Sequence, residues 1–225
     1  PAILMWVIGN EWNYNKLYSS MSFDDALHRV REVASIVKEV DASHPVSTVY
    51  GHLPDRSVIE RLPQIDVWGL NVYTGKTLGG IFSAWQSRSS LPMYLGEFGA
   101  DAWDARAGRV NEEAQAEATR ALTEEIVAHS SAAHAGGVAV GGFIFEFADE
   151  WWKDGRGSDS RHDAGGVAPG GGPYPDSTFN EEYWGLVHED RRPRLAYGAY
   201  ASVAAPGTGA TSPAPPPPPP SGGCA

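Results

Sequence analysis

The sequence has little cysteine, few positive charges and no long apolar run. Its 225 residues include one cysteine, Cys224, which excludes an internal disulfide framework and a cysteine-based zinc cluster. The 17 Lys and Arg against 28 Asp and Glu give a formal net charge of −11, which argues against nucleic acid or an anionic membrane surface as a partner. No apolar run reaches the roughly 18–20 residues of a membrane-spanning helix. The seven His show no metal-ligand spacing.

What the sequence does contain is a regular alternation of apolar strands and helical patterns. Continuous apolar runs predict strands at residues 3–8, 46–50, 65–73, 93–98 and 138–147. The first helix is expected to begin at a capping box of Ser22 and Asp25 and to end before Pro45. Further helices are expected near residues 54–62, 79–88, 111–134 and 193–203. Because no hairpin signal separates the strands, the alternation predicts parallel strands joined by helical crossovers.

Two architectures fit this alternation, an open doubly wound sheet and a closed (β/α)8 barrel. No glycine-rich phosphate loop follows any of the strands. Polar and aromatic residues instead follow the strand ends, at Asn10-Glu11-Trp12, Tyr73, Glu97, and Glu146 with Trp151-Trp152. Functional groups at the C-terminal ends of many strands are typical of the barrel. The predicted fold class is therefore α/β, a (β/α)8 TIM barrel with five strands present and about three missing.

Two segments fall outside the regular pattern. Residues 154–183 form a long loop rich in Gly, Asp and Pro, and loops of this length are usually functional or disordered. Residues 204–225 are dominated by Pro, Gly, Ser, Ala and Thr, with six consecutive prolines at 215–220, which predicts a disordered linker of polyproline II character. The barrel domain is thus expected to occupy residues 1–203. The proline-rich segment favours an extracellular or cell-wall location.

Two glutamates are candidates for chemistry. Glu11 directly follows an apolar strand and Asn10, and Glu97 lies at the end of another apolar strand between Gly96 and Phe98. A glutamate at such a position usually has a partner or a function. Hydrolysis of a glycosidic bond needs two carboxyl groups, of which one protonates the leaving oxygen and the other attacks or activates water. The alternative interpretation is that each glutamate forms a salt bridge at the rim of the sheet.

Aromatic residues are concentrated in or near the loops that follow the strands. They are Trp12, Tyr14, Tyr73, Trp103, Trp151, Trp152 and Trp184. Flat aromatic rings can stack on the apolar C–H faces of sugars, whereas any single Trp could equally be part of the core. Trp151 and Trp152 follow a strand end and precede the long loop, which suits a substrate-binding wall.

Five strings in sequence order resemble the catalytic barrel of clan A glycoside hydrolases. They are WVIGNEW, DVWGLNVYTG, PMYLGEFGAD, GGFIFEFADEWW and YWGLVHEDRRPRLAYGAY. The pattern is closest to the C-terminal half of the barrel domain of glycoside hydrolase family 2, the β-glucuronidase and β-galactosidase type. The resemblance covers residues 1–203 and implies that strands four to eight are present. The chain departs from the glucuronidases because their Asn-x-Lys element, which recognises the glucuronate carboxylate, is not evident.

The resemblance implies a function and a set of site residues. A retaining glycoside hydrolase is expected, with Glu11 as general acid/base and Glu97 as nucleophile. Asn10 would hold the sugar 2-hydroxyl and Tyr73 would orient Glu97. No cofactor or metal is implied, and the expected partner is a carbohydrate substrate. The chain is expected to continue upstream into the missing strands, and a further module after Cys224 is also a candidate. The alternatives are a β-glucan transglycosylase of the same clan and a truncated carbohydrate-binding pseudoenzyme.

Overall fold

The computed structural model describes most of the chain up to residue 205. The described residues are 2–14, 21–133, 135–153, 157, 158, 160–163, 168, 169 and 178–205. The expected linker at 204–225 lies outside them from residue 206 onward, as does much of the long loop at 154–183. Within the described residues, no helix has the length and apolar character needed to cross a membrane.

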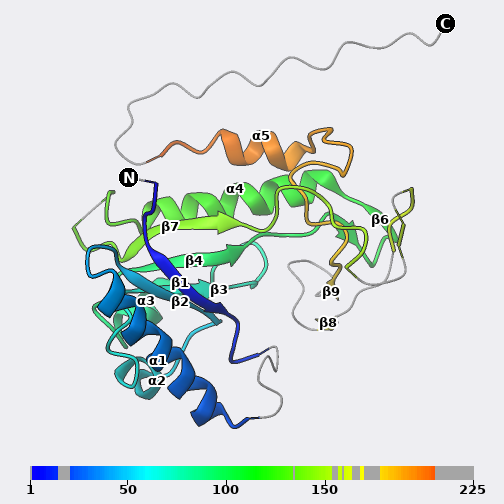
Figure 1. The fold of residues 1–225 in the computed structure, drawn as a ribbon. Helices are drawn as coiled ribbons and strands as arrows, with labels where there is room; N and C mark the ends of the chain where they lie inside the picture. The colour runs from blue at the N-terminus through cyan, green and yellow to red at the C-terminus, as the bar shows by residue number, and fades with distance from the viewer. Residues whose placement is uncertain are drawn as a thin grey trace, which may run out of the picture.

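The centre of the fold is a five-stranded parallel sheet (Figure 1). Its strands stand in the order β1-β2-β3-β4-β7, with bounds Trp6–Asn10, Val46–Gly51, Val67–Asn71, Met93–Phe98 and Ala139–Ile144. Each neighbouring pair is parallel. The predicted α/β alternation with parallel strands is therefore confirmed. The sheet does not close on itself, since β1 and β7 are its two edges.

In the described part of the chain, five helices connect and follow the strands, and all five were expected. They are α1 (Phe23–Val40), α2 (Arg56–Glu60), α3 (Ile81–Gln86), α4 (Glu112–Ala128) and α5 (Leu195–Ala201). Figure 1 shows α1, α2 and α3 beside the first strands, α4 beside β7, and α5 beside α4. At the start of α1, the amide of Asp25 donates to Ser22 Oγ at 3.1 Å and the amide of Ser22 donates to Asp25 Oδ2 at 3.2 Å. The expected capping box is thus present.

Among the described residues, the larger of two hydrophobic clusters packs helices against the sheet. Along β3, Trp68 and Leu70 enter this core, where they meet buried residues of the helices such as Leu27, Phe82 and Leu122. Because side chains alternate along a strand, Asn71 belongs to the opposite face. Helices therefore cover one face of the sheet, and the other face carries Asn71 together with Val49 and Tyr94, whose side chains lie against Gly69.

The expectation that no hairpin interrupts the alternation is wrong between β4 and α4. There β5 (Trp103–Asp104) pairs antiparallel with β6 (Arg109–Val110). The carboxylate of Asp104 accepts the amides of Arg106 and Ala107, and Gly108 has a φ of +64°, which favours glycine. These turn residues close the hairpin although the two strands are too short to produce a period-two pattern. A second short pair joins β8 (Ala168–Pro169) to β9 (Thr178–Phe179).

Both edges of the sheet carry exposed apolar side chains. Val7 on β1 is 49% exposed, and Phe143 on β7 is 60% exposed. In helix α1 the buried face is made by Ala26, Leu27, Val30 and Ala34, whereas Val33, Ile36 and Val40 are exposed. Helix α1 therefore carries more apolar side chains than the rest of the described chain covers.

Candidate active site

The carboxyl ends of the parallel strands converge on a pocket of about 760 Å³. Asn10 is the last residue of β1, Asn71 is the last residue of β3, and Glu97 lies near the end of β4. Glu11 directly follows β1, where the chain turns through two residues of positive φ, Gly9 and Glu11. Functional groups contributed by several strand ends at one edge are the usual arrangement of barrel sites.

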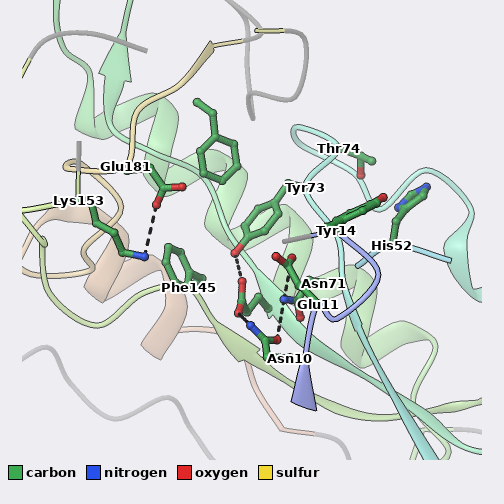
Figure 2. Close-up of a pocket in the computed structure, with 12 residues that line it drawn as sticks. Asn10, Glu11, Tyr14, His52, Asn71, Tyr73, Thr74, Phe145, Lys153 and Glu181 are labelled. Atoms are coloured by element: carbon green, nitrogen blue, oxygen red, sulfur yellow. Dashed lines mark hydrogen bonds and ion pairs between the residues drawn. The ribbon is translucent and has the colours of Figure 1, made fainter. Parts of the chain in front are cut away.

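Glu97 is held by two donors inside this pocket (Figure 2). The hydroxyl of Tyr73 donates to Glu97 Oε2 at 2.7 Å, and Asn10 Nδ2 donates to Glu97 Oε1 at 3.3 Å. Burial raises the pKa of Glu97 above that of an ordinary glutamate, and the nearby charge of Glu11 acts in the same direction. The hydrogen bond from Tyr73 opposes this rise, because it stabilises the ionised carboxylate.

Asn71 connects the two glutamates. Its Nδ2 donates to Glu11 Oε1 at 3.0 Å and to Asn10 Oδ1 at 3.1 Å, and Asn10 in turn donates to Glu97. Sequence reasoning did not single out Asn71, although it lies within the string that contains Tyr73. The signal was available, because residues two apart on an extended segment share a face and Asn71 is two residues before Tyr73.

An aromatic cluster supports Tyr73. Its ring makes edge contacts with Trp184, Phe179 and Phe145, at centroid distances of 5.0, 5.1 and 6.2 Å. Burial, followed by the charge of Glu97, raises the pKa of the Tyr73 hydroxyl well above its usual range. The hydroxyl therefore keeps its proton and acts as a fixed donor to Glu97.

The remaining lining residues come from loops. Figure 2 shows Tyr14, His52 and Thr74 on one side of Tyr73, and Phe145, Lys153 and Glu181 on the other. The side chain of Phe179 also lines the pocket. Sequence reasoning named Tyr14 among the aromatics but missed the others, since no local pattern brings residues 52, 153 and 181 together.

The other tryptophans expected near the glutamates are distributed over different environments. Trp12 and Trp184 are buried, and Trp12 Nε1 donates to Thr48 Oγ1 at 3.0 Å within the core. Trp151 and Trp152 line a separate pocket of about 580 Å³ together with Phe147 and Arg191. The structure thus does not bring Trp151 and Trp152 to the pocket of Glu11 and Glu97, and their part in substrate binding stays a prediction.

No family model matches this sequence, and no curated protein does. Among solved structures, a β-glucuronidase of Bacteroides uniformis matches 90% of this chain with a TM-score of 0.53 and 19% identity. An FMN-binding β-glucuronidase from Facaelibacterium prausnitzii L2-6 matches 89% of it with a TM-score of 0.53 and 20% identity. The chain spans only 24% and 29% of those two proteins. At this identity the likeness shows the fold alone, which is α/β and resembles part of a TIM barrel.

Proposed function

We propose that this chain carries the catalytic centre of a retaining β-glycosidase, with Glu97 as nucleophile and Glu11 as general acid/base. The observation that carries the proposal is the continuous set of hydrogen bonds from Glu11 through Asn71 and Asn10 to Glu97. Two carboxyl groups in one open pocket are what glycoside hydrolysis requires. The five strings that resemble clan A glycoside hydrolases and the fold shared with β-glucuronidases point in the same direction.

The two steps of the reaction use these groups as follows. The Glu97 carboxylate attacks the anomeric carbon while the bond to the leaving oxygen breaks, and that oxygen takes the proton of Glu11. Glu11, now ionised, then removes a proton from water, whose oxygen attacks the anomeric carbon and releases Glu97. Tyr73 and Asn10 donate hydrogen bonds to Glu97 and would keep it oriented for the first step, and Asn10 would also bind the sugar 2-hydroxyl.

The experiment that tests the proposal separates the two carboxylates in the full-length protein. Glu97→Ala should abolish formation of the glycosyl-enzyme on every substrate. Glu11→Ala should retain activity on dinitrophenyl glycosides, whose leaving group needs no proton, and lose it on glycosides with poor leaving groups. An inactivator that labels nucleophilic carboxylates should modify Glu97. Labelling of Glu11, or a product of inverted anomeric configuration, would refute the assignment.

The same experiment addresses the alternative activities. If a β-glucan acceptor outcompetes water in the second step, the products contain longer chains and the protein is a transglycosylase. If the full-length protein binds oligosaccharides but forms no glycosyl-enzyme, it is a carbohydrate-binding pseudoenzyme.

We further propose that additional β/α units complete the barrel beside β1 and β7, so that the five strands correspond to strands four to eight. The exposed Val7 and Phe143 at the two open edges support this, because unpaired apolar edges favour aggregation.

A further inference from the structure

The pocket has two chemically different ends on either side of Tyr73 (Figure 2). One end, here called the Tyr14 end, is formed by Tyr14, His52 and Thr74. It lies beside Glu11, since the amide of Tyr14 donates to the carbonyl oxygen of Glu11 at 2.9 Å. The other end, the Lys153 end, is formed by Phe145, Lys153 and Glu181.

Lys153 is already paired with carboxylates at its end of the pocket. Its Nζ lies 3.7 Å from Glu181 Oε2, 3.5 Å from Glu150 Oε2 and 5.4 Å from the centroid of the Phe145 ring. Burial acts to lower the pKa of Lys153, but the charges of Glu181 and Glu150 outweigh it, so the pKa is raised and the ammonium stays charged. Glu181 lines the pocket, whereas Glu150 contacts the same ammonium from the neighbouring pocket.

The proposed roles of the two glutamates determine which end of the pocket holds the leaving group and which end holds the sugar. Because Glu11 protonates the leaving oxygen, the leaving group has to lie on the side of Glu11, at the Tyr14 end. The sugar that Glu97 attacks then extends toward the Lys153 end, where the ring of Phe145 offers an apolar surface to its C–H face. We propose that the Lys153 end binds this sugar, that the sugar is uncharged, and that Glu181 and Lys153 bind its hydroxyl groups. This inference rests on the proposed function.

The charges of the pocket decide between an uncharged sugar and a uronate. Among the described residues that line it, three carry carboxyl groups, Glu11, Glu97 and Glu181, and Lys153 alone carries a fixed positive charge. A uronate carboxylate would have to compete with Glu181 and Glu150 for that ammonium and would be repelled by Glu97. A hydroxyl group can donate to Glu181 and accept from Lys153 at once, and it brings no charge into the pocket. The fold shared with β-glucuronidases therefore does not imply that this pocket binds a glucuronate.

The first test compares pairs of substrates in the full-length protein. Nitrophenyl β-glucoside and β-glucuronide share one leaving group and differ only at C6, and the β-galactoside and β-galacturonide form a second pair. We expect kcat/KM to be at least roughly tenfold higher for the neutral member of the accepted pair, because bringing like charges together in a binding site weakens binding by at least that factor. Higher kcat/KM for the uronide would overturn the inference.

The second test asks whether Glu181 contacts the sugar directly. Glu181→Gln should raise KM for neutral glycosides by roughly tenfold, as expected for a lost hydrogen bond to a charged group, and should reduce the preference over uronides. Glu150→Gln is the matched control, because it removes the other partner of the same ammonium outside this pocket. If KM rises equally in both variants, Glu181 only positions Lys153, and the proposed role of Glu181 in sugar binding is overturned.

A series of substrates with one sugar and different leaving groups tests which end of the pocket binds the sugar. Glu181→Gln should lower kcat/KM by the same factor for every leaving group. His52→Asn should lower kcat/KM by a factor that varies with the leaving group. The reverse pattern would place the sugar at the Tyr14 end and refute the inference while leaving the enzyme class intact. Failure of the full-length protein to cleave any glycoside would remove the proposed function, and this inference with it.

Discussion

Removing the Tyr73 hydroxyl should separate the chemistry of Glu97 from the stability of the fold. In Tyr73→Phe the ring keeps its edge contacts with Trp184, Phe179 and Phe145, and only the 2.7 Å hydrogen bond to Glu97 is lost. A hydrogen bond to a charged acceptor contributes about 1.5–3 kcal/mol. Since about 1.4 kcal/mol corresponds to tenfold in rate, kcat/KM should fall by roughly ten- to a hundredfold.

The pH dependence of kcat/KM should also change in Tyr73→Phe, in a direction that follows from the pKa of Glu97. The hydrogen bond from Tyr73 favours the ionised form of Glu97 and lowers its pKa, against the rise caused by burial. As the proposed nucleophile, Glu97 has to be ionised, so loss of the hydroxyl should move the acidic limb of the kcat/KM profile to higher pH. The assay is kcat/KM for an aryl β-glycoside as a function of pH in the full-length protein.

Tyr94→Phe provides the matched control. Tyr94 is also a buried tyrosine with a hydrogen-bonded hydroxyl, which lies 3.0 Å from Ser47 Oγ and outside the lining of the pocket. This variant should lose about 1 kcal/mol of stability and leave the pH profile unchanged. An acidic limb that does not move in Tyr73→Phe, or that moves equally in both variants, would refute the role of Tyr73 in orienting Glu97.

Three further predictions follow from other parts of the fold. Burial, and then the charge of Glu150, raises the pKa of Glu146 to about 9, so the folded protein keeps a proton that the unfolded chain loses above the ordinary glutamate pKa. The stability of the folded protein should therefore fall as the pH rises from the ordinary glutamate pKa to about 9. Glu146→Gln has no proton to lose, so its Tm relative to the unchanged protein should rise with pH over that range. A Tm difference that does not change with pH would contradict this. Trp151→Ala in the full-length protein should weaken substrate binding with little change in Tm, whereas normal binding with a Tm lower by several degrees would assign Trp151 to packing. Residues 1–225 expressed alone should aggregate or unfold without a sharp transition, and a soluble monomer with a two-state melt would show that the open edges need no partner.

The elements that sequence patterns predicted well are those whose pattern is local. The capping box of Ser22 and Asp25 set the start of α1, and the apolar run at 93–98 gave β4 to the residue. The short pair of β5 and β6 was missed because two-residue strands carry no periodicity and depend on the turn at Asp104 and Gly108. The exposed side of α1 could not be predicted, because the apolar positions of a helix do not show which of them a neighbouring element covers.

The sequence alone named Glu11 and Glu97 as candidates, because a carboxylate at the end of an apolar strand is rare and conspicuous, and their catalytic roles stay a prediction. It also determined the alternation that makes the strands parallel and brings their carboxyl ends to one edge. Only the tertiary structure decided how the two glutamates are connected, through Asn71 and Asn10, and that Lys153 and Glu181 form the far end of the same pocket. The physical reason is that hydrogen-bond geometry and pocket walls depend on residues far apart along the chain, whose approach is set by packing across the whole sheet and not by any local pattern.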